Sequence, residues 1–576
     1  MGETQGLCIL LTEKPSRTGF GFFRYARELT EQENPPAPLR HIFSLMRMQK
    51  CSFMVEEELQ PNERCLRQMD ITQGISLLGN YRRRVIRLTF FKCNKPDGPF
   101  KSKTRDEALR NCEKDWHSFR QLLKEPGSDL KCLGFLYLYT DYAGKSPRHS
   151  HVHAAVIATD NLESPNKYIH SSPLYAGRVH NDFWFPVVGS YFAQQDTFLS
   201  CCYHTALMVC LKNIYAALNL PCIASYELMN EIARVDCHKR RSNEPLSLSP
   251  AKALDILGEL LPFRHEAIAT NRLCVPNDVI ASAYHSVEAA LPSVIYFYED
   301  LINDNPMGMG HAMAVVGHTF EAGLWQYRKH DLRHCEWPAY HKQHYHHCPS
   351  HLWAEGLVIQ DEASGPYCTL PWHALIDRYP GVIIPRLNWT IKSYPQEAEI
   401  AAERILNPGV KAHSDFFQSI LDSDAAPASK DANGWFFEVK RHVEASKDQL
   451  CFRAIRSHVL RTVPCTPRSY LKFLRDLASP DLCQTVKRDL GESPFWLVEI
   501  SVPHLFQWNN ERLGEVVVPV STSPCDSVTV YLVRLPGVLT LFEEDGSCRH
   551  HKISGDYHYP LTTQESMPLK ELLTAR

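Results

Sequence analysis

The middle of the chain carries four residues whose types cooperate in thiol catalysis. In chain order they are Gln195, Cys201, His311 and Asp361. A cysteine thiolate attacks a carbonyl carbon, a histidine carries the proton to the leaving group, and a carboxylate orients the histidine. A side-chain amide donates a hydrogen bond to the oxyanion that forms during the attack. These residue types therefore indicate nucleophilic catalysis by a cysteine.

The residues that follow Cys201 predict a helix. Apolar residues recur at helical spacing from 201 to 218, which places Cys201 in the first turn. Backbone N–H groups and the dipole at a helix start favour an anion, so a thiol there ionises more readily. Cys202 follows directly, and a register shifted by one residue would make Cys202 the nucleophile instead. His204, on the same helix, is expected to line the cleft rather than to act as the base.

The histidine and the acid belong to predicted strands. His311 opens an apolar strand after a glycine-rich approach, and a second strand, 356–361, ends at Asp361. Side chains alternate along a strand, so Asp361 shares a face with Leu357 and Ile359. A carboxylate at that strand end can accept the N–H of His311 and fix the orientation of its ring. We therefore expect a hydrogen bond between the two side chains.

The surrounding segments predict the elements that position these residues. Further helices are predicted at 225–235, 250–260 and 277–290. The His311 strand is predicted at 311–317, and two further strands are predicted at 292–298 and 381–385. One long helix is thus followed by more helices and then by a set of strands. This order is typical of an α+β domain in which a helix packs against an antiparallel sheet.

Three short segments together resemble papain-like cysteine peptidases, most closely the branch that processes bacteriocins with double-glycine leaders. The segments are Gln195-x5-Cys201 with Met208-Val209 further along the helix, Gly310-His311-Ala-Met-Ala-Val-Val-Gly317, and the later Asp361. The resemblance implies a papain-like fold, with the nucleophile helix packed on an antiparallel sheet. It also implies that Cys201, His311 and Asp361 are nucleophile, base and orienter. Gln195 would then help to form the oxyanion hole.

The chain departs from that family in two respects. Cys202 stands where the family commonly has Gly or Trp, which is why the register of the nucleophile stays open. The bacteriocin-processing peptidases are usually fused to a membrane exporter, and no such region is recognisable in this chain. The resemblance therefore does not imply export-coupled cleavage of a leader.

The resemblance covers only the middle of the chain. We expect an N-terminal α+β region over 1–180, a papain-like domain over 181–392 and a C-terminal α+β region over 393–576. The papain-like domain carries a histidine-rich insertion at 318–355 between its histidine and aspartate strands. The sequence indicates no role for the two flanking regions.

The insertion contains residues that could bind a metal. The candidate ligands are Cys335, Cys348, His334, His344 and His347. Two thiolates and imidazole nitrogens suit zinc, and a long loop would gain from a metal that holds it. The spacing matches no standard zinc finger. A solvated, aromatic-rich flap is the favoured interpretation, with structural zinc as the alternative.

A second histidine run, His149, His151 and His153, alternates so that its three imidazoles share one face of a strand. Metal binding is one interpretation of this run. Display of polar side chains on the surface is the interpretation that we favour.

Composition limits the partners and the compartment. A net charge of −3 gives no reason to expect nucleic acid or an anionic membrane as partner. No stretch approaches the roughly 20 apolar residues that cross a bilayer. The 20 cysteines lack the regular spacing of a disulfide framework, and no secretory signal is recognisable. We expect reduced thiols in the cytoplasm; the oligomeric state is not indicated.

The favoured function is that of a cysteine hydrolase, most simply a peptidase that acts on a peptide or protein substrate and requires no cofactor. Acyl transfer on the same fold, as in transglutaminases and arylamine acetyltransferases, is one alternative. The other is a papain-like scaffold that has become a protein-binding module with an inert thiol.

Overall fold

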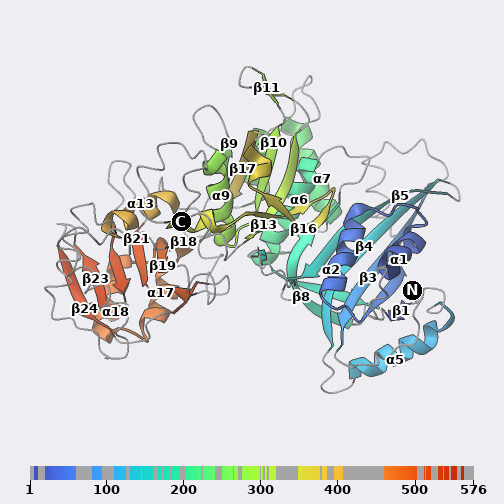
Figure 1. Cartoon of the computed structure of the whole chain (residues 1–576), viewed down its shortest axis with the longest axis horizontal. Helices are drawn as coiled ribbons and strands as arrows, with labels where there is room; N and C mark the ends of the chain where they lie inside the picture. Colours follow the sequence, from blue (N-terminus) through green and yellow to red (C-terminus); the bar gives the residue numbers. More distant parts are fainter. Residues whose placement is uncertain are drawn as a thin grey trace.

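The chain is organised around three seven-stranded β-sheets. The computed structural model describes residues 6–10, 20–59, 81–93, 109–159, 162–194, 202–319, 348–406 and 459–562, with short gaps inside these ranges. Figure 1 shows the three sheets side by side along the long axis, with the central sheet between the N-terminal and C-terminal ones. Helices cover the sheets, and the strand pairs are almost all antiparallel. The expected α+β class is confirmed.

The N-terminal sheet has the strand order β1-β2-β3-β4-β5-β8-β7 and is antiparallel throughout. Its strands are β1 (Gly6–Leu10), β2 (Phe53–Leu59), β3 (Tyr81–Lys92), β4 (Lys131–Ala143), β5 (Ser146–Ala158), β7 (Leu174–Val179) and β8 (Phe183–Phe192). Helices α1 (Phe20–Thr30) and α2 (Ala37–Met48) pack on one face. Helix α5 (Cys112–Lys124) packs on the other. The sheet thus includes β8, which follows the boundary expected at 181.

The central sheet has the order β16-β15-β13-β10-β17-β9, and β6 pairs with the end of β13. Its strands are β6 (Lys167–Ile169), β9 (His265–Ala269), β10 (Ser293–Tyr298), β13 (His311–Thr319), β15 (Gly356–Asp361), β16 (Gly365–Pro371) and β17 (Tyr379–Pro385). A small hairpin joins β11 (Asp300–Ile302) to β12 (Asn305–Met307). The sequence thus placed the strands that carry His311 and Asp361 next to each other correctly.

Helices cover both faces of the central sheet. They are α6 (Cys202–Ala217), α7 (Ser225–Lys239), α8 (Pro250–Leu260) and α9 (Pro276–Glu288), with the short α12 (His373–Ile376) and the 3-10 turn η2 (Ser350–Trp353). Helices α6, α7 and α8 share one apolar core with the sheet, whereas α9 packs against the opposite face. The predicted helices at 225–235, 250–260 and 277–290 correspond to α7, α8 and α9.

Helix α6 is buried between two sheets. Every residue from Tyr203 to Tyr215 is buried, including Lys212 and Asn213. Its apolar side chains join a core that contains residues of β4 and β5 as well as of β10 and β13. Burial of one large apolar side chain contributes about 1.5–3 kcal/mol relative to its exposure. The helix start that carries Cys202 is therefore held from two sides.

A buried amide fixes α6 to the N-terminal sheet. Asn213 Oδ1 accepts the backbone N–H of Tyr191 at 2.7 Å and the hydroxyl of Tyr175 at 3.1 Å. Its Nδ2 donates to the carbonyl of Val209 at 2.9 Å. A buried side-chain amide that satisfies neighbouring backbone groups sets both position and rotation of the helix.

The C-terminal sheet has the order β14-β18-β19-β21-β22-β23-β24. Its strands are β14 (Cys348–Pro349), β18 (Val459–Cys465), β19 (Phe495–Ser501), β21 (Gly514–Pro519), β22 (Leu532–Leu535), β23 (Val538–Phe542) and β24 (Cys548–Lys552); β20 (Glu511–Arg512) pairs with β25 (Tyr559–Pro560). Helices α17 (Pro467–Leu474) and α18 (Pro480–Leu490) share its core, and α13 (Pro395–Leu406) lies against β18, β19 and β21. Strand β14, from the end of the insertion, pairs in parallel with β18.

Local signals set the ends of the two C-terminal helices. Thr466 and Ser479 are the N-caps of α17 and α18, and each side chain accepts the backbone N–H three residues on. Proline follows each cap, where its missing N–H costs no helical hydrogen bond. Gly491 ends α18 with φ of 61°, a conformation that favours glycine.

Buried arginines inside the sheets pair with acids directly across the strands. Each pair consists of register partners on neighbouring strands: Glu57 with Arg87, Arg83 with Asp141, Arg461 with Glu499, and Glu515 with Arg534. All eight residues are buried. Ionised groups in a core require such partners, because an isolated buried charge is very unfavourable.

Two expectations about histidines need correction. The strand β13 extends through Thr319, so the insertion expected at 318–355 begins after that residue, and His318 is a buried strand residue. His151 on β5 is only 1% exposed, so polar display on the surface is wrong for it. Burial, as the main cause, lowers the pKa of His151 to about 3. Among the helices that the structure describes, none is long and apolar enough to cross a bilayer.

Candidate active site

Three elements of the central region bring Cys202, His311 and Asp361 together. Cys202 is the first residue of α6, His311 is the first residue of β13, and Asp361 is the last residue of β15. Strands β13 and β15 are antiparallel neighbours, and α6 packs on β13. The first residue of β13 and the last residue of β15 therefore lie at the same end of these two strands, beside the start of the buried helix.

The thiol of Cys202 lies against the first residues of β13. Its Sγ is 3.8 Å from the carbonyl oxygen of Gly310, the residue before His311. The thiol also lies close enough to the His311 side chain to raise the pKa of that imidazole. Cys202 is partly exposed, in contrast to the buried residues that follow it on α6. The thiol at the helix start is thus accessible and adjacent to an imidazole.

The imidazole of His311 is oriented by Asp361. Its Nε2 lies 3.0 Å from Asp361 Oδ1 and donates to it, since a carboxylate only accepts. Oδ1 also accepts the backbone N–H of Ala363 at 3.1 Å, which fixes the carboxylate. Gly365, with φ of 131°, closes the tight turn that carries this N–H and starts β16. With Nε2 bound to Asp361, Nδ1 is the nitrogen left to exchange a proton with the thiol.

The groups around His311 favour its charged form. The hydrogen bond with Asp361 is the main cause that raises the pKa of His311 to about 10, and the interaction with the Cys202 thiol is the second cause. Burial acts in the opposite direction. Burial would raise the pKa of Asp361, but the hydrogen bond from His311 keeps it below its ordinary value. The His311 side chain is 28% exposed, so the imidazolium keeps contact with solvent. A thiolate beside an imidazolium is the reactive form of a catalytic cysteine.

The structure confirms the expected hydrogen bond between His311 and Asp361. Of the two candidate thiols, only Cys202 belongs to the described residues, and it lies beside His311, as in the alternative register of the sequence analysis. Cys201 and Gln195 lie outside the described residues. The apolar pattern of the helix could not separate the two registers, because α6 is buried all round and leaves no polar face to fix its rotation.

His204 does not line the cleft as expected. It is buried, and its Nε2 lies 3.4 Å from Asp236 Oδ2 on α7. A polar pair inside a core holds two helices together. His204 therefore belongs to the contact between α6 and α7.

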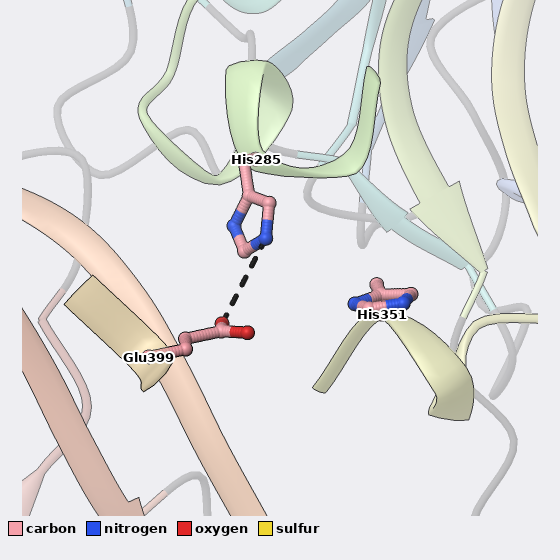
Figure 2. A group of neighbouring side chains, drawn as sticks. All are labelled: His285, His351 and Glu399. Atoms are coloured by element: carbon pink, nitrogen blue, oxygen red, sulfur yellow. Dashed lines mark ion pairs between the residues drawn. The ribbon is translucent and has the colours of Figure 1, made fainter. Parts of the chain in front are cut away.

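The residues proposed from sequence as metal ligands are not described with side chains. His334, Cys335, His344 and His347 lie outside the described residues, and of Cys348 only the backbone is described, in β14. The structure instead groups His285, His351 and Glu399, shown in Figure 2. These three residues come from distant parts of the chain, so no local spacing pointed to them.

No family model, curated protein or solved structure matches this chain. A functional assignment therefore depends on the geometry of the site.

Proposed function

We propose that this chain is a papain-like cysteine hydrolase that cleaves amide bonds in peptide or protein substrates. Cys202 is the nucleophile, His311 the general base and acid, and Asp361 the residue that orients the histidine. The observation that supports this most strongly is the hydrogen bond from His311 to Asp361 beside the thiol of Cys202, which stands at the start of a buried helix.

The proposed reaction needs only these groups and water. His311 takes the thiol proton, and the thiolate attacks the amide carbonyl to give a tetrahedral oxyanion. The first N–H groups of α6 have no acceptor within the helix and can donate to that oxyanion. His311 then protonates the leaving amine, and a thioester remains on Cys202. Water, deprotonated by His311, hydrolyses the thioester and releases the acid.

The proposal requires a reducing environment such as the cytoplasm, because the nucleophile must stay a thiol. Cys132, Cys210 and Cys465 are buried and carry thiols rather than disulfides. Burial raises the pKa of each of these thiols to about 12, which makes them poor nucleophiles. Cys202 differs from them in both its exposure and its imidazole neighbour.

Cleavage of a fluorogenic peptide library tests the proposal with a matched pair of variants. Cys202→Ala removes the proposed nucleophile and should lower kcat/KM by about 10³-fold or more, since nothing replaces the thiolate. Cys201→Ala is the control and should stay within a few-fold of wild type. Loss of activity in Cys201→Ala alone would contradict the assignment of the nucleophile. Transfer of the acyl group to an added primary amine, in preference to water, would identify an acyltransferase instead.

A further inference from the structure

A second cluster of chemically capable side chains lies away from Cys202. His285 is on α9, His351 is in η2, and Glu399 is on α13. One ligand atom from each residue lies within 4.8 Å of the other two. Their exposed fractions are 4%, 9% and 1%. Figure 2 shows the two imidazoles and the carboxylate extending from three separate elements into the same space.

His285 has no hydrogen bond that would explain its burial. Neither of its ring nitrogens makes a hydrogen bond of normal geometry to a described residue, although the backbone of Thr462 lies near the ring. Nε2 lies 3.7 Å from Glu399 Oε1, which is too long for a hydrogen bond. A neutral imidazole buried with both nitrogens unbonded is unfavourable unless a further group binds there.

We infer that His285, His351 and Glu399 bind a divalent transition-metal ion, that the ion is zinc with a structural role, and that a water molecule completes its tetrahedral coordination. Two imidazole nitrogens and one carboxylate oxygen are ligands that zinc accepts at about 2.0–2.2 Å. Two atoms at that distance on a tetrahedral ion lie about 3.3 Å apart. The observed 3.7 Å between His285 and Glu399 is close to this separation, and all three ligand atoms lie within 4.8 Å of one another, so binding of the ion would draw them together. Neutral imidazole is the form that binds metal.

A hydrogen bond from the C-terminal sheet orients the carboxylate. Thr462 on β18 donates its hydroxyl to Glu399 Oε1 at 3.0 Å. Partners of this kind hold metal-binding carboxylates in place and are part of most metal sites. The ring centroids of His285 and His351 are 6.1 Å apart at an interplanar angle of 65°, so the two rings approach the site from different directions.

The location of the three residues fits a structural role for the ion. It joins α9 of the central region, the turn that follows the insertion, and α13, which packs on the C-terminal sheet. Near it, Arg461 on β18 donates to Glu288, the last residue of α9. A metal bound by all three elements would hold the end of the insertion and the C-terminal sheet to the central sheet. The burial of the three ligands leaves little access for a substrate.

Metal analysis of the untagged full-length chain, purified without chelator, tests this inference. We expect about one zinc per chain in the wild type and a loss of more than 90% in both His285→Ala and Glu399→Gln. His117→Ala, which removes an exposed histidine on α5, is the matched control and should keep its zinc. Zinc that remains in both cluster variants would assign it to other residues and overturn the inference.

The wild-type chain supplies a test that does not depend on folding of a variant. A chelator should lower its Tm by several degrees, and added zinc should restore it, because a metal that binds only the folded chain stabilises it. Alkylation of Cys202 should not change, which separates this site from the proposed catalytic one. Absence of bound metal, together with a Tm that zinc does not alter, would contradict the inference.

Discussion

Strand β13 carries a histidine near each end, and each histidine pairs with a carboxylate. His311 lies 3.0 Å from Asp361, and His318 lies 2.6 Å from Glu288. The two pairs share their chemistry and their strand. They differ in access to solvent, because the His311 side chain is 28% exposed whereas that of His318 is 2% exposed.

The second nitrogen of each ring shows the more important difference. His318 Nδ1 faces the carbonyl oxygen of Thr319 at 3.0 Å, while its Nε2 faces Glu288. Both neighbours only accept hydrogen bonds, so neither ring nitrogen of His318 faces a group that could donate a proton to it. His311 has an acceptor on one side and the Cys202 thiol on the other, and a thiol can give up a proton and take it back.

An arginine also binds the carboxylate of the buried pair formed by His318 and Glu288. Arg461 Nε donates to Glu288 Oε2 at 2.5 Å, and its Nη1 donates to Glu499 Oε2 at 2.5 Å. Burial would raise the pKa of Glu499, but Arg461 and Arg512 keep it below its ordinary value. The histidine–carboxylate pair at this end of β13 thus links the central and C-terminal sheets. The His311–Asp361 pair at the other end of β13 is partly exposed and lies beside the Cys202 thiol.

Removal of the buried carboxylate should have the largest effect. Glu288→Ala leaves Arg461 and His318 without their shared partner and should reduce the free energy of unfolding by about 3–5 kcal/mol. Glu28→Ala breaks an exposed pair with Arg24 and should cost less than about 1 kcal/mol. Urea unfolding followed by tryptophan fluorescence measures both. Equal effects of the two variants would contradict the structural role of Glu288.

The partly exposed pair of His311 and Asp361 should set the alkaline limit of the proposed hydrolysis. Because the pKa of folded His311 is raised to about 10, the imidazolium that protonates the leaving amine persists up to that pH. The stability that the pair contributes is complete below pH about 6.5 and is lost as the pH rises through about 10. Asp361→Asn removes the main cause of the shift and should move the alkaline limb of kcat down by about 1–2 pH units.

Glu362→Gln is the control for that measurement, because it removes one negative charge from the next position in the chain. It should leave the alkaline limb near that of the wild type. An alkaline limb that does not move in Asp361→Asn would contradict the role of Asp361 as the residue that orients and charges His311.

The parts of the fold that sequence predicted well are those with apolar patterns. The strands that carry His311 and Asp361 are apolar runs with glycine beside them, and the structure pairs them as expected. The N-terminal sheet contains a strand whose pattern is less clear, for a physical reason. Strand β3 contains Arg83 and Arg87, which are buried but look like exposed charges until their partners across the sheet are known.

The choice between Cys201 and Cys202 and the grouping of His285, His351 and Glu399 could not be derived from the sequence, for different reasons. Cys201 and Cys202 are adjacent, and a helix buried on all sides gives no amphipathic pattern that fixes which thiol faces His311. His285 and Glu399 come together because α9 and α13, which are far apart in the sequence, both pack against β18. Only the folded chain shows such contacts.

The most direct test of the central claim is the rate at which iodoacetamide modifies each cysteine at pH 6, read by peptide mass spectrometry. An ordinary thiol is less than about 1% ionised at this pH. We predict that Cys202 reacts at least tenfold faster than Cys112 and Cys483, two partly exposed thiols on other helices, and that His311→Ala abolishes the difference. Reaction of Cys202 no faster than these two thiols, or an equal rate in His311→Ala, would contradict a reactive thiol held by His311.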